Sequence, residues 1–196
     1  MRIVAGKFRG KNLTNSDHLK SLRPTTDKNR EALFNILSSG KIIKEIGFEI
    51  IGADILDLCC GSGAVGFEAL SRGAKSVLFL DNNSVHLNLV KKNSEILKVE
   101  NSIKILNADA KKLPKNDKFF DLIFIDPPYA EDYLAIMNSL SENGWLQKNS
   151  LIVVEFQTAT KPQDFALENF KLLDLRQYGK TSFAFFMNQK ISPSQS

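Results

Sequence analysis

Cysteine, histidine and tryptophan are scarce in this chain, whose 196 residues include two cysteines, two histidines and one tryptophan. Cys59 and Cys60 are adjacent within an apolar run, which makes them poor candidates for a structural disulfide. His18 and His86 lie elsewhere in the chain, so the sequence contains no spacing typical of metal ligands. We therefore expect neither a disulfide scaffold nor a metal site.

Long apolar segments are also missing. No run of residues stays apolar for long enough to cross a bilayer, and the first residues, MRIVAGKFRGK, lack the apolar core of a signal peptide. Hydrophobic residues still make up 43% of the chain, which suits one domain with a real core and leaves no room for a second full domain. We expect a soluble, cytoplasmic protein that makes no contact with a membrane.

Positive charge is concentrated near the start of the chain. Residues 1–30 contain eight Lys or Arg residues and two Asp residues, a net charge of +6; because the whole chain has +4, the rest carries −2. Such a basic segment suggests a polyanionic partner, with nucleic acid the first candidate. We expect residues 2–13 to be extended around a glycine turn, with Lys7, Arg9 and Lys11 on one face. An ordinary solvated edge strand would carry the same lysines, so that alternative stays open.

From residue 54 onward, short apolar strands alternate with amphipathic helices. The expected strands are residues 54–59, 76–81, 103–107, 121–125 and 150–156, then a hairpin of residues 172–178 and 182–187. The expected helices are residues 64–71, 83–97 and 132–142, preceded by one that begins at the capping residues 25–27 and stops before Gly40. Residues 41–53 fit either a short helix or extended chain. This alternation predicts an α/β fold with a Rossmann-like, mostly parallel seven-stranded sheet and one antiparallel strand from the closing hairpin.

The strand of residues 121–125 is followed directly by Asp126-Pro127-Pro128-Tyr129. The prolines end the strand, because proline has no N–H to donate to a sheet. Ligands of open α/β sheets bind beyond the carboxyl ends of the strands, where Asp126 offers an acceptor and Tyr129 a flat ring. These groups suit a planar substrate that carries an amino group, although a plain Pro-Pro turn would also account for the motif by itself.

The first regular strand is followed by a glycine-rich loop, Gly61-Ser62-Gly63-Ala64-Val65-Gly66, which opens a helix. Glycines at this place permit a tight turn and let a ligand approach the backbone beside the positive end of the helix. Asp81 ends the next strand, 20 positions after Gly61, and its carboxylate can accept from both hydroxyls of a ribose. The pattern predicts a nucleoside cofactor bound by Gly61, Ser62, Gly63, Asp81 and Asn82.

Two cofactors fit this pattern, a nicotinamide dinucleotide and S-adenosylmethionine. Asp57 lies in the first strand near the glycine loop, where it favours a cationic amino-acid group over a phosphate. Asp109 follows the third strand, beside Ala110, and can accept from an adenine amino group. Asp126 ends the fourth strand in a motif that hydride transfer does not require. These features favour S-adenosylmethionine, although a lone Asp is also common in caps and turns.

With these motifs the chain resembles a known family. The glycine loop, Asp81, Asp109 and residues 126–129 are similar to the motifs of class I S-adenosylmethionine-dependent amino-methyltransferases. Two blocks near the start, RIVAGKFRGK from Arg2 and LRPTTDKNREALFN from Leu22, resemble the RsmD family, and the similarity extends over nearly the whole chain. Members of that family are bacterial 16S ribosomal RNA guanine-N2 methyltransferases.

The resemblance implies S-adenosylmethionine as cofactor and, as substrate, one guanine of 16S ribosomal RNA in a partly assembled small subunit, modified by a monomeric enzyme. It implies a catalytic role for Asp126, Pro127, Pro128 and Tyr129, with Asp126 also touching the cofactor. Thr26, Arg30 and Glu31 would face the cofactor and the substrate; the alternative is an ordinary helix start with solvated charges. RNA contacts are expected from the basic residues Arg2, Lys7, Arg9, Lys11 and Arg23.

Other functions share parts of this pattern. An NAD-linked oxidoreductase would use the glycine loop, and a noncatalytic RNA-binding module would use the basic segment. An amino-methyltransferase acting on adenine N6 or on a protein glutamine would use residues 126–129 in the same way. We expect a basic N-terminal hairpin or arm of residues 1–24, a methyltransferase domain of residues 25–190 and a disordered tail of residues 191–196.

Overall fold

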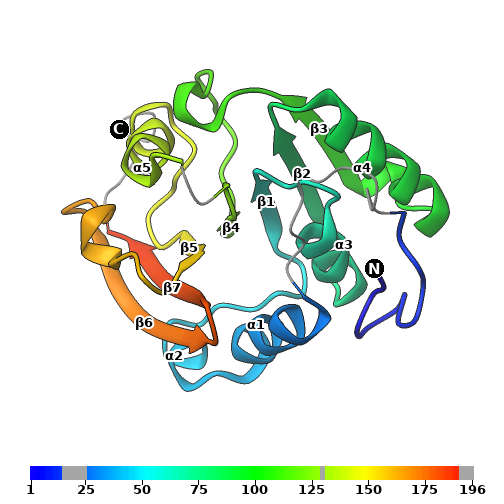
Figure 1. Ribbon diagram of the computed structural model, residues 1–196, viewed down its shortest axis with the longest axis horizontal. Coiled ribbons are helices and arrows are strands. Elements are labelled where there is room, and N and C mark those ends of the chain that lie inside the picture. The colour runs from blue at the N-terminus through cyan, green and yellow to red at the C-terminus, as the bar shows by residue number, and fades with distance from the viewer. Residues whose placement is uncertain (15–25, 129–130, 190–196) are drawn as a thin grey trace.

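The computed structural model describes residues 1–14, 26–128 and 131–189, which build one seven-stranded sheet with helices on both faces (Figure 1). The strands, in chain order, are β1 (Asp54–Leu58), β2 (Ser76–Asp81), β3 (Ile103–Asn107), β4 (Leu122–Ile125), β5 (Leu151–Gln157), β6 (Phe170–Tyr178) and β7 (Thr181–Asn188). Their spatial order is β3-β2-β1-β4-β5-β7-β6. Strands β1 to β5 pair in parallel, and β7 runs antiparallel to both β5 and β6. The predicted fold class and the single antiparallel strand are confirmed.

In the described part of the chain, five α-helices connect and cover these strands. They are α1 (Asp27–Ser39), α2 (Lys41–Glu45), α3 (Ala64–Ser71), α4 (Ser84–Leu97) and α5 (Tyr133–Glu142), with 3-10 turns η1 (Glu100–Ser102), η2 (Ala110–Lys112) and η3 (Pro162–Asp164). The side chain of Thr26 caps α1 by accepting from Asn29 N–H, and Gly40 ends it. Residues 41–53, unassigned from the sequence, form α2 and then turns.

The core has two halves, one on each face of the sheet. Apolar side chains of α1 to α4 pack against one face, over Phe79 of β2 and Phe124 of β4. Side chains of α5 and of the segment around Trp145 pack against the other face, over Leu80 and Ile125. Because successive strand residues point to opposite faces, a strand covered on both sides must be apolar throughout, as β4 is.

Within the described residues, no helix combines the length and apolar character that a membrane span requires.

The N-terminal segment has the predicted extended arms around a glycine turn, but its basic residues are placed differently from the prediction. Arg2 and Asn12 form an antiparallel bridge, Ile3 N–H donates to the carbonyl of Lys11 at 3.0 Å and Leu13 N–H to that of Met1 at 2.9 Å, while residues 5–10 form bends and turns. Lys7 N–H donates to the carbonyl of Ser71 at 2.7 Å, which holds the turn against the end of α3. A Cβ on Gly6 (φ +79°) would lie 1.9 Å from that same carbonyl oxygen, so the close approach requires glycine. Lys7 and Arg9 lie in the turn that docks on α3, so the three basic residues do not share one face of a strand.

Candidate functional site

The glycine loop connects β1 to α3 with left-handed backbone at Gly61 (φ +53°) and Gly63 (φ +81°). Gly63 is the N-cap of α3 and provides no side-chain cap, so the N–H groups of the first turn need partners from elsewhere, and that of Gly66 donates to Asp57. A Cβ on Gly66 would lie 2.3 Å from Cε1 of Phe79, so this glycine lets α3 pack closely on β2. The loop thus has two of the glycine roles of a nucleotide-binding turn, a tight turn and close helix–strand packing.

Asp81 lies at the carboxyl end of β2 and is held against the loop. Its Oδ2 accepts from Gly61 N–H at 2.9 Å and its Oδ1 from Asn83 N–H at 2.9 Å. Nδ1 of His86 lies 3.2 Å from Oδ2. Asp81 is 7% exposed, and Oδ1, which has one described donor, has a further lone pair. The sequence analysis did not single out His86. Its position at the third residue of α4, shortly after Asp81 in the sequence, could have indicated this contact.

Asp57 lies on β1 beneath the loop and is 2% exposed. Its Oδ2 accepts from Gly66 N–H at 2.9 Å, in the first turn of α3. Burial raises the pKa of this carboxyl to about 8; the Gly66 hydrogen bond opposes the rise, and the charge of Asp81 adds to it. Asp57 is therefore largely protonated at neutral pH, and a cation placed nearby would favour its charged form.

Cys59 and Cys60 enter the same loop as free thiols. Burial raises the pKa of both thiols, and the neighbouring charges of Asp57 and Asp81 raise them further. A thiol that stays protonated is a poor nucleophile. These cysteines therefore fill space beside the loop.

Asp126 follows β4 at the same edge of the sheet. Its N–H donates to the carbonyl of Leu58 at 3.3 Å, which extends the pairing of β4 with β1 by one residue. Pro127 is buried and Pro128 is exposed, and the strand ends before them as predicted. The carbonyl of Pro128 accepts from Glu131 N–H at 2.9 Å. Tyr129 lies outside the described residues.

Asp109 follows β3 and caps η2, where its Oδ1 accepts from Lys111 N–H at 2.9 Å. The adjacent Ala110 is buried, and Asn82, after β2, is exposed. Because β3, β2, β1 and β4 are neighbours in that order, their carboxyl ends place Asp109, Asp81, the glycine loop and Asp126 along one edge. The sheet thus brings together the predicted acidic residues, and a cofactor role for each of them stays a prediction.

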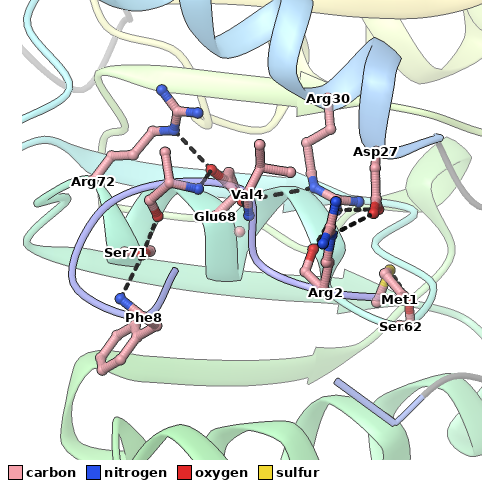
Figure 2. Close-up of polar contacts among 12 residues, drawn as sticks. Met1, Arg2, Val4, Phe8, Asp27, Arg30, Ser62, Glu68, Ser71 and Arg72 are labelled. Carbon is pink, nitrogen blue, oxygen red and sulfur yellow. Dashed lines mark hydrogen bonds and ion pairs between the residues drawn. The ribbon is translucent and has the colours of Figure 1, made fainter. Parts of the chain in front are cut away.

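Arg30, expected to face the cofactor and the substrate, is held inside the protein, and that role stays a prediction. Its guanidinium is buried, and Nη2 donates to the carbonyl of Arg2 at 2.6 Å and to Oδ1 of Asp27 at 2.7 Å. Its Nε lies 3.7 Å from Oε2 of Glu68 (Figure 2). The physical reason is that a buried guanidinium needs several acceptors, and these three come from the N-terminal segment, α1 and α3. Thr26 and Glu31, at the start of the same helix, are exposed.

Glu68, on α3, holds the N-terminal segment in place and was missed by sequence reasoning. The carboxylate is fully buried and accepts from Val4 N–H at 2.8 Å and Ala5 N–H at 3.0 Å (Figure 2). Nε of Arg72 donates to the same carboxylate at 2.8 Å. The available signal was one acidic residue within the otherwise apolar helix AVGFEALS.

The basic side chains of the N-terminal segment remain on the surface. Arg2, Lys7, Arg9 and Lys11 are exposed, and Arg2 lies 3.4 Å from Asp27 across the surface. Arg23 lies outside the described residues. In the part of the chain that the structure describes, no group of three His, Cys, Asp or Glu residues could hold a metal ion.

A seven-stranded sheet of this order, with β7 antiparallel beside β5 and a glycine loop after β1, defines a Rossmann-like methyltransferase fold. The family model described as Conserved hypothetical protein 95 matches residues 1–187, and the chain belongs to this family, the RsmD family.

Relatives and solved structures agree with this assignment. The chain is 38% identical to Ribosomal RNA small subunit methyltransferase D of Haemophilus influenzae, over 96% of this chain and 94% of the relative. It is 34% identical to the protein of that name from Escherichia coli K12, over 88% and 84% of the two chains. A methyltransferase structure from Escherichia coli superposes with a TM-score of 0.76 at 29% identity, and a methylase structure from Haemophilus influenzae with 0.73 at 34%. Each comparison covers 96% of this chain and 98% of the solved one.

Proposed function

We propose that this methyltransferase transfers a methyl group from S-adenosylmethionine to the exocyclic N2 amine of one guanine in 16S ribosomal RNA. The observation that carries the proposal is the position of Asp126 and Pro127 at the carboxyl end of β4, beside the glycine loop and Asp81. The relatives named Ribosomal RNA small subunit methyltransferase D support RNA of the small subunit as the substrate.

The residues at the carboxyl ends of β3, β2, β1 and β4 fit S-adenosylmethionine. A Cβ on Gly63 would lie 2.8 Å from the ring of Phe67 and 2.9 Å from that of Phe79, so the tight turn beside the proposed nucleoside site requires glycine. Asp81 would accept from the ribose hydroxyls, and Asp109 from the adenine amino group. Asp57, whose pKa burial raises to about 8, would become charged beside the amino-acid ammonium. The bound cofactor would supply an activated methyl group.

Asp126 and the Pro127 carbonyl would position the substrate amine. The lone pair of a guanine amino group is delocalised into the ring, so the nitrogen is a weak nucleophile while it stays planar. Two acceptors that take its two N–H bonds would let the nitrogen pyramidalise and direct its lone pair at the methyl group. The guanine must leave its stack to reach this edge, and Tyr129 would stack on the extruded base.

The N-terminal segment would bind the RNA backbone. Its exposed Arg2, Lys7, Arg9 and Lys11, together with Arg23, would contact phosphates, because basic side chains supply most sequence-independent affinity for nucleic acid. In this proposal residues 1–24 form an RNA-binding arm of the methyltransferase domain of residues 25–190.

Labelled S-adenosylmethionine, offered with one substrate class at a time, tests the proposal. The classes are unmethylated small subunits, naked 16S RNA, DNA and total protein, and the products are digested and identified as nucleosides or amino acids. We expect N2-methylguanosine from the RNA samples and none with Asp126→Ala, while that variant keeps much of its cofactor affinity. Label in N6-methyladenosine or glutamine would overturn the guanine target, and substantial turnover by Asp126→Ala would overturn its catalytic role.

A further inference from the structure

Asn93, on α4, joins two segments that the proposed function treats separately. Its side chain is fully buried. Nδ2 donates to the carbonyl of Ser62 at 3.1 Å, in the glycine loop, and to the carbonyl of Thr14 at 3.0 Å, at the end of the described N-terminal segment. Oδ1 accepts from Thr14 N–H at 2.7 Å. Both donors and the acceptor of one amide are thus divided between the cofactor loop and the basic segment.

Ser62 is held from a second side by the same segment. Its Oγ donates to Sδ of Met1 at 3.7 Å (Figure 2). The neighbouring Gly61 N–H donates to Asp81, the residue expected to bind the ribose. A ligand that settles on the loop backbone would therefore act on Ser62, whose carbonyl is hydrogen-bonded to Asn93 and whose hydroxyl contacts Met1.

The rest of the N-terminal segment is anchored to the helix that this loop opens. Glu68 accepts from Val4 and Ala5, and Oγ of Ser71 accepts from Phe8 N–H at 2.9 Å. The turn that carries Lys7 and Arg9 is thus fixed to α3 at one end, while Asn93 ties Thr14 to Ser62 at the other. A shift of Ser62 would reach Thr14 through one rigid, buried amide.

We propose that Asn93 is a positioning residue that couples the cofactor loop to the RNA-binding segment, so that S-adenosylmethionine and RNA bind cooperatively. This inference rests on the proposed function, which supplies both ligands. Because coupling is reciprocal, the factor by which the cofactor tightens RNA binding equals the factor by which RNA tightens cofactor binding. A residue with a purely structural role would change either affinity without changing that factor.

The coupling factor is measured with S-adenosylhomocysteine, which occupies the cofactor site without turnover. The dissociation constant of unmethylated 16S RNA is determined by fluorescence anisotropy with and without saturating S-adenosylhomocysteine. The reciprocal constant is determined by calorimetry with and without RNA. The variants are Asn93→Ala, which removes all three hydrogen bonds, and Thr14→Pro, which removes one N–H donor at an exposed residue. Asn88→Ala, on the exposed face of the same helix, is the matched control.

We expect S-adenosylhomocysteine to tighten RNA binding by the wild type and by Asn88→Ala about tenfold, within the usual range of coupling energies. In Asn93→Ala and Thr14→Pro the factor should fall towards one, whatever change either variant makes to RNA affinity in the absence of S-adenosylhomocysteine. If Asn93→Ala does not fold, Thr14→Pro decides the result. Coupling that persists in Thr14→Pro, or a wild-type factor of one, overturns the inference alone. A wild type that binds neither ligand overturns the proposed function instead.

Discussion

Gly66 N–H, in the first turn of α3, donates to Oδ2 of Asp57 on β1 at 2.9 Å. This hydrogen bond holds the helix that follows the glycine loop against a carboxyl that is almost completely buried. Burial raises the pKa of Asp57 to about 8, far above the value of about 3.9 for an exposed Asp. The carboxyl beneath the loop therefore changes charge near neutral pH.

Asp57→Asn should change how stability depends on pH. Between pH about 4 and about 8, unfolded wild-type protein has lost the Asp57 proton that folded protein retains, so the unfolding free energy falls as pH rises. Asn cannot ionise and can still accept from Gly66 N–H, so the variant should gain stability relative to wild type as pH rises through this window. Urea unfolding of both proteins at several pH values measures the difference, and a difference that is the same at every pH would contradict it.

Asp81→Ala should weaken binding of S-adenosylmethionine. The loss of a charge-assisted acceptor should cost roughly 1.5–3 kcal/mol, and Gly61 N–H would also lose its partner. Calorimetric titration measures the affinity, with Asp117→Ala, an exposed residue away from the loop, as the control. An unchanged dissociation constant for Asp81→Ala would remove Asp81 from the site.

Replacing Lys7, Arg9 and Lys11 together by Gln should weaken RNA binding and flatten its salt dependence. Each lost phosphate contact lowers the slope by roughly 0.7–0.9, so the change should approach three units at most. Cofactor affinity should be unaffected. The matched control replaces Lys161, Lys171 and Lys180, three exposed lysines at the other end of the sheet. The same slope in wild type and in the Lys7, Arg9 and Lys11 variant would make the turn an ordinary charged surface.

Tyr129 provides a test of stacking on the substrate base. If the ring is a platform, its face matters and its hydroxyl does not, so Tyr129→Phe should keep most of the activity. Tyr129→Ala should raise the barrier by ~1–3 kcal/mol, or about tenfold or more in rate. Rates measured with RNA, together with dissociation constants for the cofactor, distinguish a loss of stacking on the base from a loss of cofactor binding. Equal damage from Phe and Ala would mean that the hydroxyl is required.

Glu68→Ala should destabilise the fold through the N-terminal segment. Removing the buried carboxylate leaves Val4 N–H and Ala5 N–H without this acceptor and Arg30 without one of its anionic neighbours. Breaking a buried ion pair from one side costs about 3–5 kcal/mol. Urea unfolding measures the loss, with Glu95→Ala on the exposed face of α4 as the control. Equal stability of the two variants would show that the segment docks without Glu68.

Local chemistry in the sequence determined most of the secondary structure and the edge where the candidate site lies. The bounds of α3, β2 and β3 were predicted as observed. Apolar periodicity, helix caps and glycine turns set these bounds, and each depends only on residues a few positions apart. The same holds for the end of β4, since Pro127 cannot donate to the ladder wherever the strand lies in the sheet.

Tertiary structure alone decided the N-terminal segment and the surroundings of Arg30. Residues 5–10 turn because Glu68 and Ser71, more than sixty positions away, accept their N–H groups and those of their neighbours. From the sequence, Arg30 could face the cofactor or be a solvated charge at the start of a helix. Its burial follows from acceptors on Arg2 and Glu68, which are distant in sequence. Side-chain burial depends on which distant segments pack together, so these contacts could be found only from the folded chain.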